Sequence, residues 1–146
     1  MNLSSNVKIS SAITPAAGVA AATDLEGTTL DMLGYRGVMM VVRFGAIDGG
    51  AVTSIKAQQD SVSTMATAAD LLGTGQTIAD NDDNECFVID LYEPRERYVR
   101  LYVDRGTQNA VVASAEYIQY DPMVAVTTQG SGVTAELHVS PAEGTA

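Results

Sequence analysis

The feature that most constrains the fold is an alternation of apolar and polar residues. The stretch RYVRLYVDRGTQNAVVASAEYIQY (97–120) alternates on both sides of RGTQNA. Successive side chains of a β-strand point to opposite faces, so this pattern predicts two strands joined by a turn. In that turn we expect Gly106 to adopt a positive φ, and Thr107 and Asn109 to hydrogen-bond locally to the backbone.

The first of these two strands predicts one buried and one exposed face. Val99, Leu101 and Val103 should face a core. The other face should then carry Tyr98, Arg100, Tyr102 and Asp104.

Strand-like segments recur along the rest of the chain. The apolar run VMMVVRFGAI (38–47) is followed by a Gly-Gly turn and by VTSIKAQQD (52–60), which predicts a hairpin. In its second strand Thr53, Ile55 and Ala57 should point inward, and Ser54, Lys56 and Gln58 outward.

Three further segments complete the expected elements. LEGTTLDML (25–33) is typical of a strand with Leu25 and Leu33 on one face, and CFVIDLYEP (86–94) of a strand that Pro94 stops. MATAADLLGTG (65–75) is the one segment in which we expect a helix, ended by Gly73.

These elements predict an all-β fold in a chain of 146 residues. We expect an antiparallel β-sandwich or jelly-roll-like barrel with one short helix and extended terminal arms. Residues 1–24 should form an N-terminal arm or edge strand, 25–120 the β-sandwich domain, and 121–146 a C-terminal arm.

The charge balance bears on the choice of partner. Eighteen acidic and eight basic residues give a formal net charge of -10. Nucleic-acid binding needs a basic surface, so we expect no nucleic-acid partner. The N-terminus lacks the basic start and apolar core of a signal peptide, and no run approaches the roughly 20 apolar residues of a membrane span. We therefore expect a protein used without secretion and without membrane contact.

An acidic loop is the best candidate for a metal site. Asp80, Asp82, Asp83 and Glu85 offer oxygen ligands at near-alternate positions, as Ca²⁺ prefers. The loop departs from the EF-hand pattern, because Glu85 replaces the sixth-position glycine and Leu91 the twelfth-position glutamate. A solvated loop is the favoured interpretation, and we expect neither a metal nor another cofactor.

Catalytic constellations are weakly supported. His138 is the single histidine, so a zinc site of the usual kind lacks a second histidine, and a nucleophile–histidine arrangement would need His138 to be buried. Cys86 is the single cysteine, and its strand-like surroundings predict a small buried residue. The glycines of GTGQT and GAIDGG lack a phosphate-binding lysine, and Glu93 and Glu96 are typical of a surface loop. We expect no catalytic residue and no enzymatic activity.

A cluster of arginines and tyrosines is the remaining candidate site. One interpretation is a solvated sheet face with cross-strand pairs to neighbours such as Glu116. The other is a protein interface, where Tyr and Arg are enriched. Under the second interpretation, Arg100→Ala should leave the fold intact and weaken assembly. The candidate interface residues are Arg95, Arg97, Tyr98, Arg100, Tyr102 and Arg105.

The segment 92–122 resembles the head decoration, or cement, proteins of tailed bacteriophages. The resemblance is carried by Pro94, the RYVR run (97–100), RGT (105–107), NAVV (109–112) and IQY (118–120). It extends more loosely to SIKAQQDSVSTM (54–65), and so covers roughly residues 50–120.

This resemblance implies a β-sandwich without enzymatic activity that binds the major capsid protein. The protein would lie on the outer surface of the virion capsid after assembly in the host cytoplasm. It would bridge capsomers and stabilise the head, as a homo-oligomer (dimer or trimer) on the capsid lattice. Flexible arms that become ordered on docking would suit that task, since they wrap a large surface.

Two alternatives remain open. A carbohydrate- or cell-surface-binding β-sandwich is disfavoured by the absence of Trp, although several tyrosines are present. A head-completion or tail subunit would instead assemble into a closed ring, so the copy number per virion distinguishes it from a decoration protein.

Overall fold

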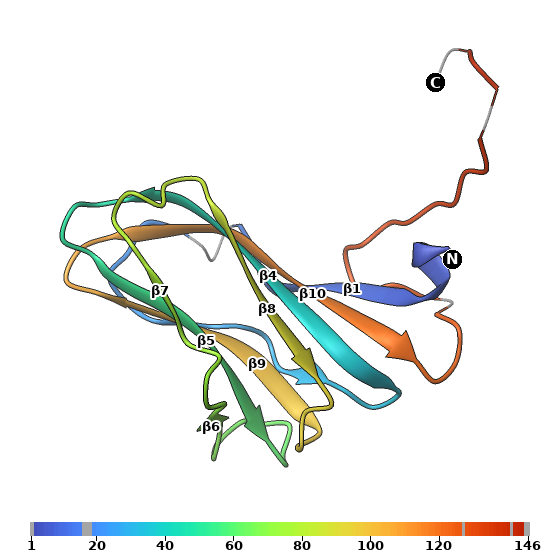
Figure 1. Ribbon diagram of the computed structural model, residues 1–146, viewed down its shortest axis with the longest axis horizontal. Coiled ribbons are helices and arrows are strands. Elements are labelled where there is room, and N and C mark those ends of the chain that lie inside the picture. Colours follow the sequence, from blue (N-terminus) through green and yellow to red (C-terminus); the bar gives the residue numbers. More distant parts are fainter. Residues whose placement is uncertain (1, 16–18, 127, 141, 145–146) are drawn as a thin grey trace.

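The protein is a sandwich of two antiparallel β-sheets (Figure 1), in a computed structural model that describes residues 2–15, 19–126, 128–140 and 142–144. A 3-10 turn, η1 (Leu3–Ser5), precedes the first strand. The prediction of an all-β fold with packed antiparallel sheets is confirmed.

The first sheet, sheet A, has four strands in the order β1-β10-β4-β8. These strands are β1 (Val7–Ile13), β10 (Ala110–Pro122), β4 (Tyr35–Ile47) and β8 (Cys86–Tyr92).

The second sheet, sheet B, is centred on β9 (Tyr98–Gly106) and β5 (Val52–Asp60). Short strands flank this pair. β2 (Leu25–Glu26) and β3 (Leu30–Asp31) pair with β9, while β6 (Ala69–Asp70) and β7 (Gln76–Ile78) pair with β5.

The core lies between the sheets and follows the expected alternation. Val99, Leu101 and Val103 of β9 are 0% exposed, as the sequence predicts. Tyr117 of β10 crosses from sheet A to sheet B: its hydroxyl accepts a hydrogen bond from the N–H of Leu101 (2.8 Å) and donates one to the carbonyl of Thr28 (2.9 Å). One side chain thus joins both sheets through two hydrogen bonds.

The predicted hairpin between 38–47 and 52–60 is wrong. β4 belongs to sheet A and β5 to sheet B, and the turn closed by the N–H of Ala51 on the carbonyl of Asp48 (3.0 Å) carries the chain from one sheet to the other. Alternation and a Gly-Gly turn are common to hairpins and to such crossings, so they did not distinguish the two. Within β5, Gln58 is also buried rather than outward.

The turn RGTQNA likewise joins two sheets. It leads from β9 in sheet B to β10 in sheet A, so the expected cross-strand pair of Arg100 with Glu116 does not form: Glu116 lies opposite Ser11 and Val41. The positive φ falls on Thr107 (70°) rather than on Gly106.

The helix expected at 65–75 is absent from the described residues. That segment consists of turns and the short strand β6, which pairs with β5. Met65 is buried with a φ of 53°, a value that a right-handed helix does not accommodate. Tertiary pairing therefore overrides the helix propensity of Ala and Leu.

Two further expectations are corrected. The segment 25–33 forms the separate strands β2 and β3. Between them Gly27 lies against the Tyr117 hydroxyl and Leu101, where a Cβ would clash. Leu33 is 69% exposed and does not share a buried face with Leu25. Cys86 is exposed rather than buried, at the start of the edge strand β8.

The terminal segments are part of the sandwich's edge. Within the segment 1–24, for which we expected an arm or an edge strand, β1 is an edge strand of sheet A. The chain after β10 returns along β1: Val126 N–H donates to the carbonyl of Ser5 (3.0 Å), and Gly130 N–H to that of Ile9 (2.9 Å). Figure 1 shows η1 and the C-terminal segment at the same end of β1.

Glutamine amides occupy both edges of sheet A. At β1, the Gln129 carbonyl accepts from the N–H of Ile9 (2.7 Å) and its amide donates to the carbonyls of Val7 (3.0 Å) and Ser4 (3.2 Å). At β8, the amide of Gln76 donates to the carbonyl of Val88 (2.7 Å). These side chains take up hydrogen bonds that an added strand would otherwise make.

Candidate protein interface

The outer face of sheet B carries most of the arginine cluster, and its charges are paired within the chain. Arg100 donates from Nε to Gln58 Oε1 (2.7 Å) and from Nη1 to Glu26 Oε2 (2.7 Å). Beside it, Lys56 bonds Asp70 (2.7 Å), with its Nζ 4.8 Å from the centroid of the Tyr102 ring. The side chain of Arg100 is only 12% exposed, so a large part of it already packs against its own sheet.

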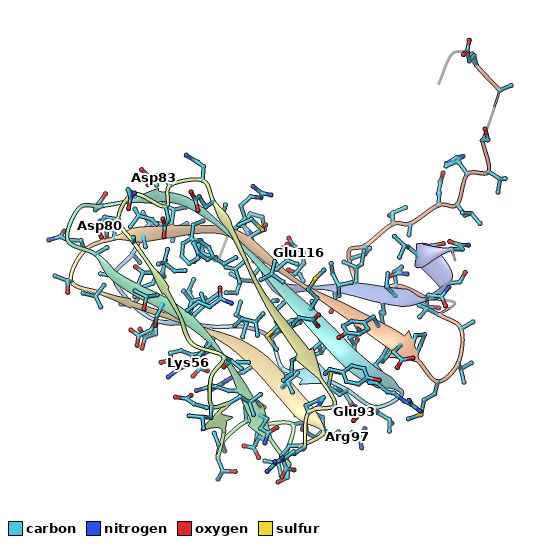
Figure 2. All side chains as sticks on the ribbon, in the orientation of Figure 1. Lys56, Asp80, Asp83, Glu93, Arg97 and Glu116 are labelled. Atoms are coloured by element: carbon cyan, nitrogen blue, oxygen red, sulfur yellow. The ribbon has the colours of Figure 1, made fainter. Side chains whose placement is uncertain are left out.

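Arg97 and Tyr102 extend this pattern of internal pairs. Arg97 binds both carboxylate oxygens of Asp31 (2.8 and 2.7 Å), and these hydrogen bonds lower the pKa of Asp31. The Tyr102 hydroxyl donates to Asp24 (2.7 Å), which raises the pKa of Tyr102 to about 12 and lowers that of Asp24. Figure 2 shows Lys56 and Arg97 on sheet B and Glu116 on sheet A.

Arg105 lies inside the domain and not on the expected surface. It is 3% exposed, and its guanidinium donates to the carbonyls of Val19 (2.9 Å), Thr23 (2.7 Å) and Ala110 (2.8 Å). Burial lowers its pKa, although the group keeps its charge. The alternation could have revealed this placement, because Arg105 shares the parity of Val103.

The remaining candidates lie near the β9 strand start. Arg95 is exposed, and Tyr98 is half-buried with the Arg97 guanidinium 5.2 Å from its ring centroid. The structure therefore brings Arg97, Tyr98, Arg100 and Tyr102 together on sheet B and separates Arg105 from them. Their role as an interface stays a prediction.

The outer face of sheet A is apolar, a feature that our sequence interpretation missed. The register places Ile9, Ile118 and Met39 in one row, which ends in Asp90 of β8. Val41 and Val88 lie in the next row, beside Glu116 of β10. All of these side chains are at least partly exposed. A signal was present, because the apolar run 38–42 predicts apolar side chains on both faces of this part of β4.

A groove of about 900 Å³ lies on this apolar face. Its floor is formed by Val7, Ile9, Met39 and Ile118, and its walls by residues 2–4 and by residues 135–138 of the C-terminal segment. Asp90, Tyr120 and Gln129 complete the lining. A concave, apolar surface of this kind buries a partner's side chains effectively.

Two tyrosines border the groove side of sheet A. The rings of Tyr92 and Tyr120 are stacked at 6.2 Å with an interplanar angle of 16°. Their hydroxyls donate to Asp121 (3.1 Å) and Asp90 (2.7 Å), and burial together with the Asp90 hydrogen bond raises the pKa of Tyr120 to about 12. Tyr120 packs over Gly37, where any Cβ would overlap its ring.

The carboxylates of the acidic loop accept hydrogen bonds from backbone N–H groups, two of them at the end of β4 and in the turn that follows it. Asp80 accepts from the N–H of Gly50 (2.6 Å), Asp83 from that of Ile47 (2.7 Å) and Asp82 from that of Ala79 (2.7 Å). Asp80 and Asp83 lie at the same end of the sandwich (Figure 2). Within the described residues, no three His, Cys, Asp or Glu side chains gather in an arrangement suited to a metal ion.

His138 and Cys86 lie apart and exposed. His138 Nε2 is 3.3 Å from Glu136 Oε2 in the C-terminal segment, whereas Cys86 lies at the start of β8. The structure does not bring these two residues together as a catalytic pair.

Comparisons with known proteins do not assign the chain to a family. No protein-family model matches the chain, and no curated protein matches it. In the part of the chain that the structure describes, no helix has the length and apolarity needed to cross a membrane.

Proposed function

We propose that this protein is a structural virion protein that binds the outer surface of a phage capsid, bridges capsomers and stabilises the head. Its partner is the major capsid protein. The resemblance of residues 92–122 to decoration proteins motivates this proposal. The observation that supports it best is the apolar groove on the outer face of sheet A, bordered by both terminal segments.

Two physical arguments favour this surface over the arginine cluster. The groove offers apolar side chains whose burial stabilises a complex, whereas the charges of sheet B already have partners within the chain. On a symmetric lattice, many copies also gain avidity from modest single contacts.

The direct test is binding to mature phage heads that lack the protein. We expect the purified protein to co-sediment with the heads in hundreds of copies and to raise the temperature at which they release DNA, because a ligand of the assembled shell stabilises it. Heads that neither bind the protein nor gain stability would contradict the proposal. A count of about a dozen per particle would indicate a ring subunit instead.

One specific observation favours a second candidate, a carbohydrate-binding module. The stacked Tyr92 and Tyr120 rings lie beside the carboxylates Asp90 and Asp121. Tyr92 is 52% exposed, so an apolar sugar face has an aromatic ring available for contact. Glycan-array binding that Tyr92→Ala abolishes would support this candidate, and a blank array would reject it.

A further inference from the structure

The C-terminal segment Val133–Val139 has the pattern of a β-strand but no strand partner among the described residues. Apolar and polar residues alternate strictly along VTAELHV, with Val133, Ala135, Leu137 and Val139 on one side. The 3.3 Å contact between Glu136 and His138 is consistent with this, because residues two apart share a face in extended backbone.

This segment is held next to the apolar groove. Just before it, Gln129 and Gly130 hydrogen-bond to the edge of β1, and Gly130 approaches so closely that a Cβ would lie 2.5 Å from the carbonyl of Ile9. The chain then turns at Gly132, which has a φ of 77°. Residues 135–138 form one wall of the groove.

The groove is only partly covered by this wall. Leu137 is 59% exposed and Val139 is 84% exposed, while Met39 and Ile118 on the groove floor remain partly exposed. Two apolar surfaces that face water and are joined by a short anchored turn gain free energy when they come together.

We propose that residues 133–139 form a strap that closes over the groove on the outer face of sheet A and gives way when a partner docks there. The closed strap shields the apolar face in the free protein. The part about the partner rests on the proposed function, because the capsid surface is the ligand that displaces the strap.

The test compares Leu137→Lys with the matched control Thr134→Lys. Both add one positive charge to the exposed segment, but Leu137 lies on the apolar side and Thr134 on the polar side. We expect Leu137→Lys to raise the fluorescence of the apolar dye ANS at least twofold, with unchanged far-UV circular dichroism, and Thr134→Lys to match the unmodified protein. Equal dye fluorescence in all three proteins would overturn the strap.

Two further measurements define the strap's action. ANS fluorescence per protein molecule should not depend on protein concentration, because the strap closes on the groove of its own chain. If the fluorescence per molecule fell as the protein concentration rose, the strap would instead bind the groove of another copy, and closure within one chain would be overturned. Leu137→Lys should bind phage heads at least threefold more tightly than the unmodified protein, because its strap no longer competes with the capsid surface for the groove. Weaker binding would overturn competition and make the segment part of the contact.

The strap and the proposed function fail in distinguishable ways. If the dye difference is present but no form of the protein binds heads, the strap stands and the capsid partner is rejected. If all forms bind heads equally and the dye shows no difference, the capsid partner stands and the strap is rejected.

Discussion

The outer faces of the two sheets have opposite character although both belong to one small sandwich. On sheet B, Arg100, Arg97 and Lys56 each pair with a carboxylate of their own chain. On sheet A, Ile118 and Met39 lie in an apolar row with a groove above it. The charged side chains of sheet B thus already have partners within the chain. The outer face of sheet A instead exposes apolar side chains to water, and such a patch is typical of an interaction site.

The largest effect on stability should come from replacing Arg105, which is buried and lies on the outer face of neither sheet. Arg105→Ala removes the buried guanidinium that donates to three backbone carbonyls. We expect a loss of about 3 kcal/mol in the free energy of unfolding, measured by urea denaturation. Arg95→Ala, at an exposed position, is the control and should change stability by less than about 0.5 kcal/mol. Similar losses for both would refute a structural role for Arg105.

The comparison between faces is tested directly by placing a charge on each. Ile118→Lys puts an ammonium in the groove floor and should weaken binding to phage heads by about 2 kcal/mol, roughly thirtyfold. Ser54→Lys makes the matched change on the outer face of sheet B and should leave binding unchanged. Co-sedimentation titrations measure both affinities. If Ser54→Lys instead caused the larger loss, the docking surface would lie on sheet B.

Arg100→Ala sharpens the same comparison with a smaller effect. The guanidinium bonds Glu26 and Gln58, so we expect a loss of about 1 kcal/mol of stability in urea denaturation. Head binding should stay within about twofold of the unmodified protein, because the interaction is internal to sheet B. A large loss of binding with normal stability would restore the interface interpretation of the arginine cluster.

The smallest effect that we predict is a loss of stability at acidic pH. Hydrogen bonds from Lys56 lower the pKa of Asp70, and those from Arg97 lower the pKa of Asp31. A carboxyl whose pKa is lower in the folded state stabilises the protein at pH values above its ordinary pKa of 3.8. That contribution is lost as the pH falls through the lower pKa of the folded state. Stability should therefore fall below about pH 4.

Asp70→Asn isolates the share of one such carboxyl. The urea midpoint of the variant should fall slightly at pH 7 and should change less between pH 7 and pH 3 than that of the unmodified protein. An unchanged acid dependence would mean that the Lys56–Asp70 pair contributes nothing measurable, as for many exposed pairs.

The sequence predicted correctly which side chains of a strand face the core, but it predicted poorly which strands lie next to one another. Alternation alone placed Val99, Leu101 and Val103 in the core, because a period of two is a local property of a strand. It could not show that β4 and β5 belong to different sheets, since pairing depends on contacts distant in the chain. The helix expected at 65–75 failed for the same reason: β5 recruits Ala69 and Asp70 as a strand.

The candidate site was only partly predictable. The side of β9 that holds Arg105 follows from counting residues, but its carbonyl partners come from the loop at 19–23 and from β10. The groove needs the register of three strands and the return of the C-terminal segment, and neither is encoded in any one local pattern.

The glutamines at the edges of sheet A have a consequence for how the protein behaves at high abundance. A β-sandwich with unprotected edges risks growing into fibres, because every open strand edge is a template for the next molecule. The amides of Gln129 and Gln76 already occupy hydrogen-bonding groups on these edges, which makes strand addition there less favourable and leaves the broad face of the sheet free. Association across the broad face of sheet A is therefore favoured over strand addition along its edges.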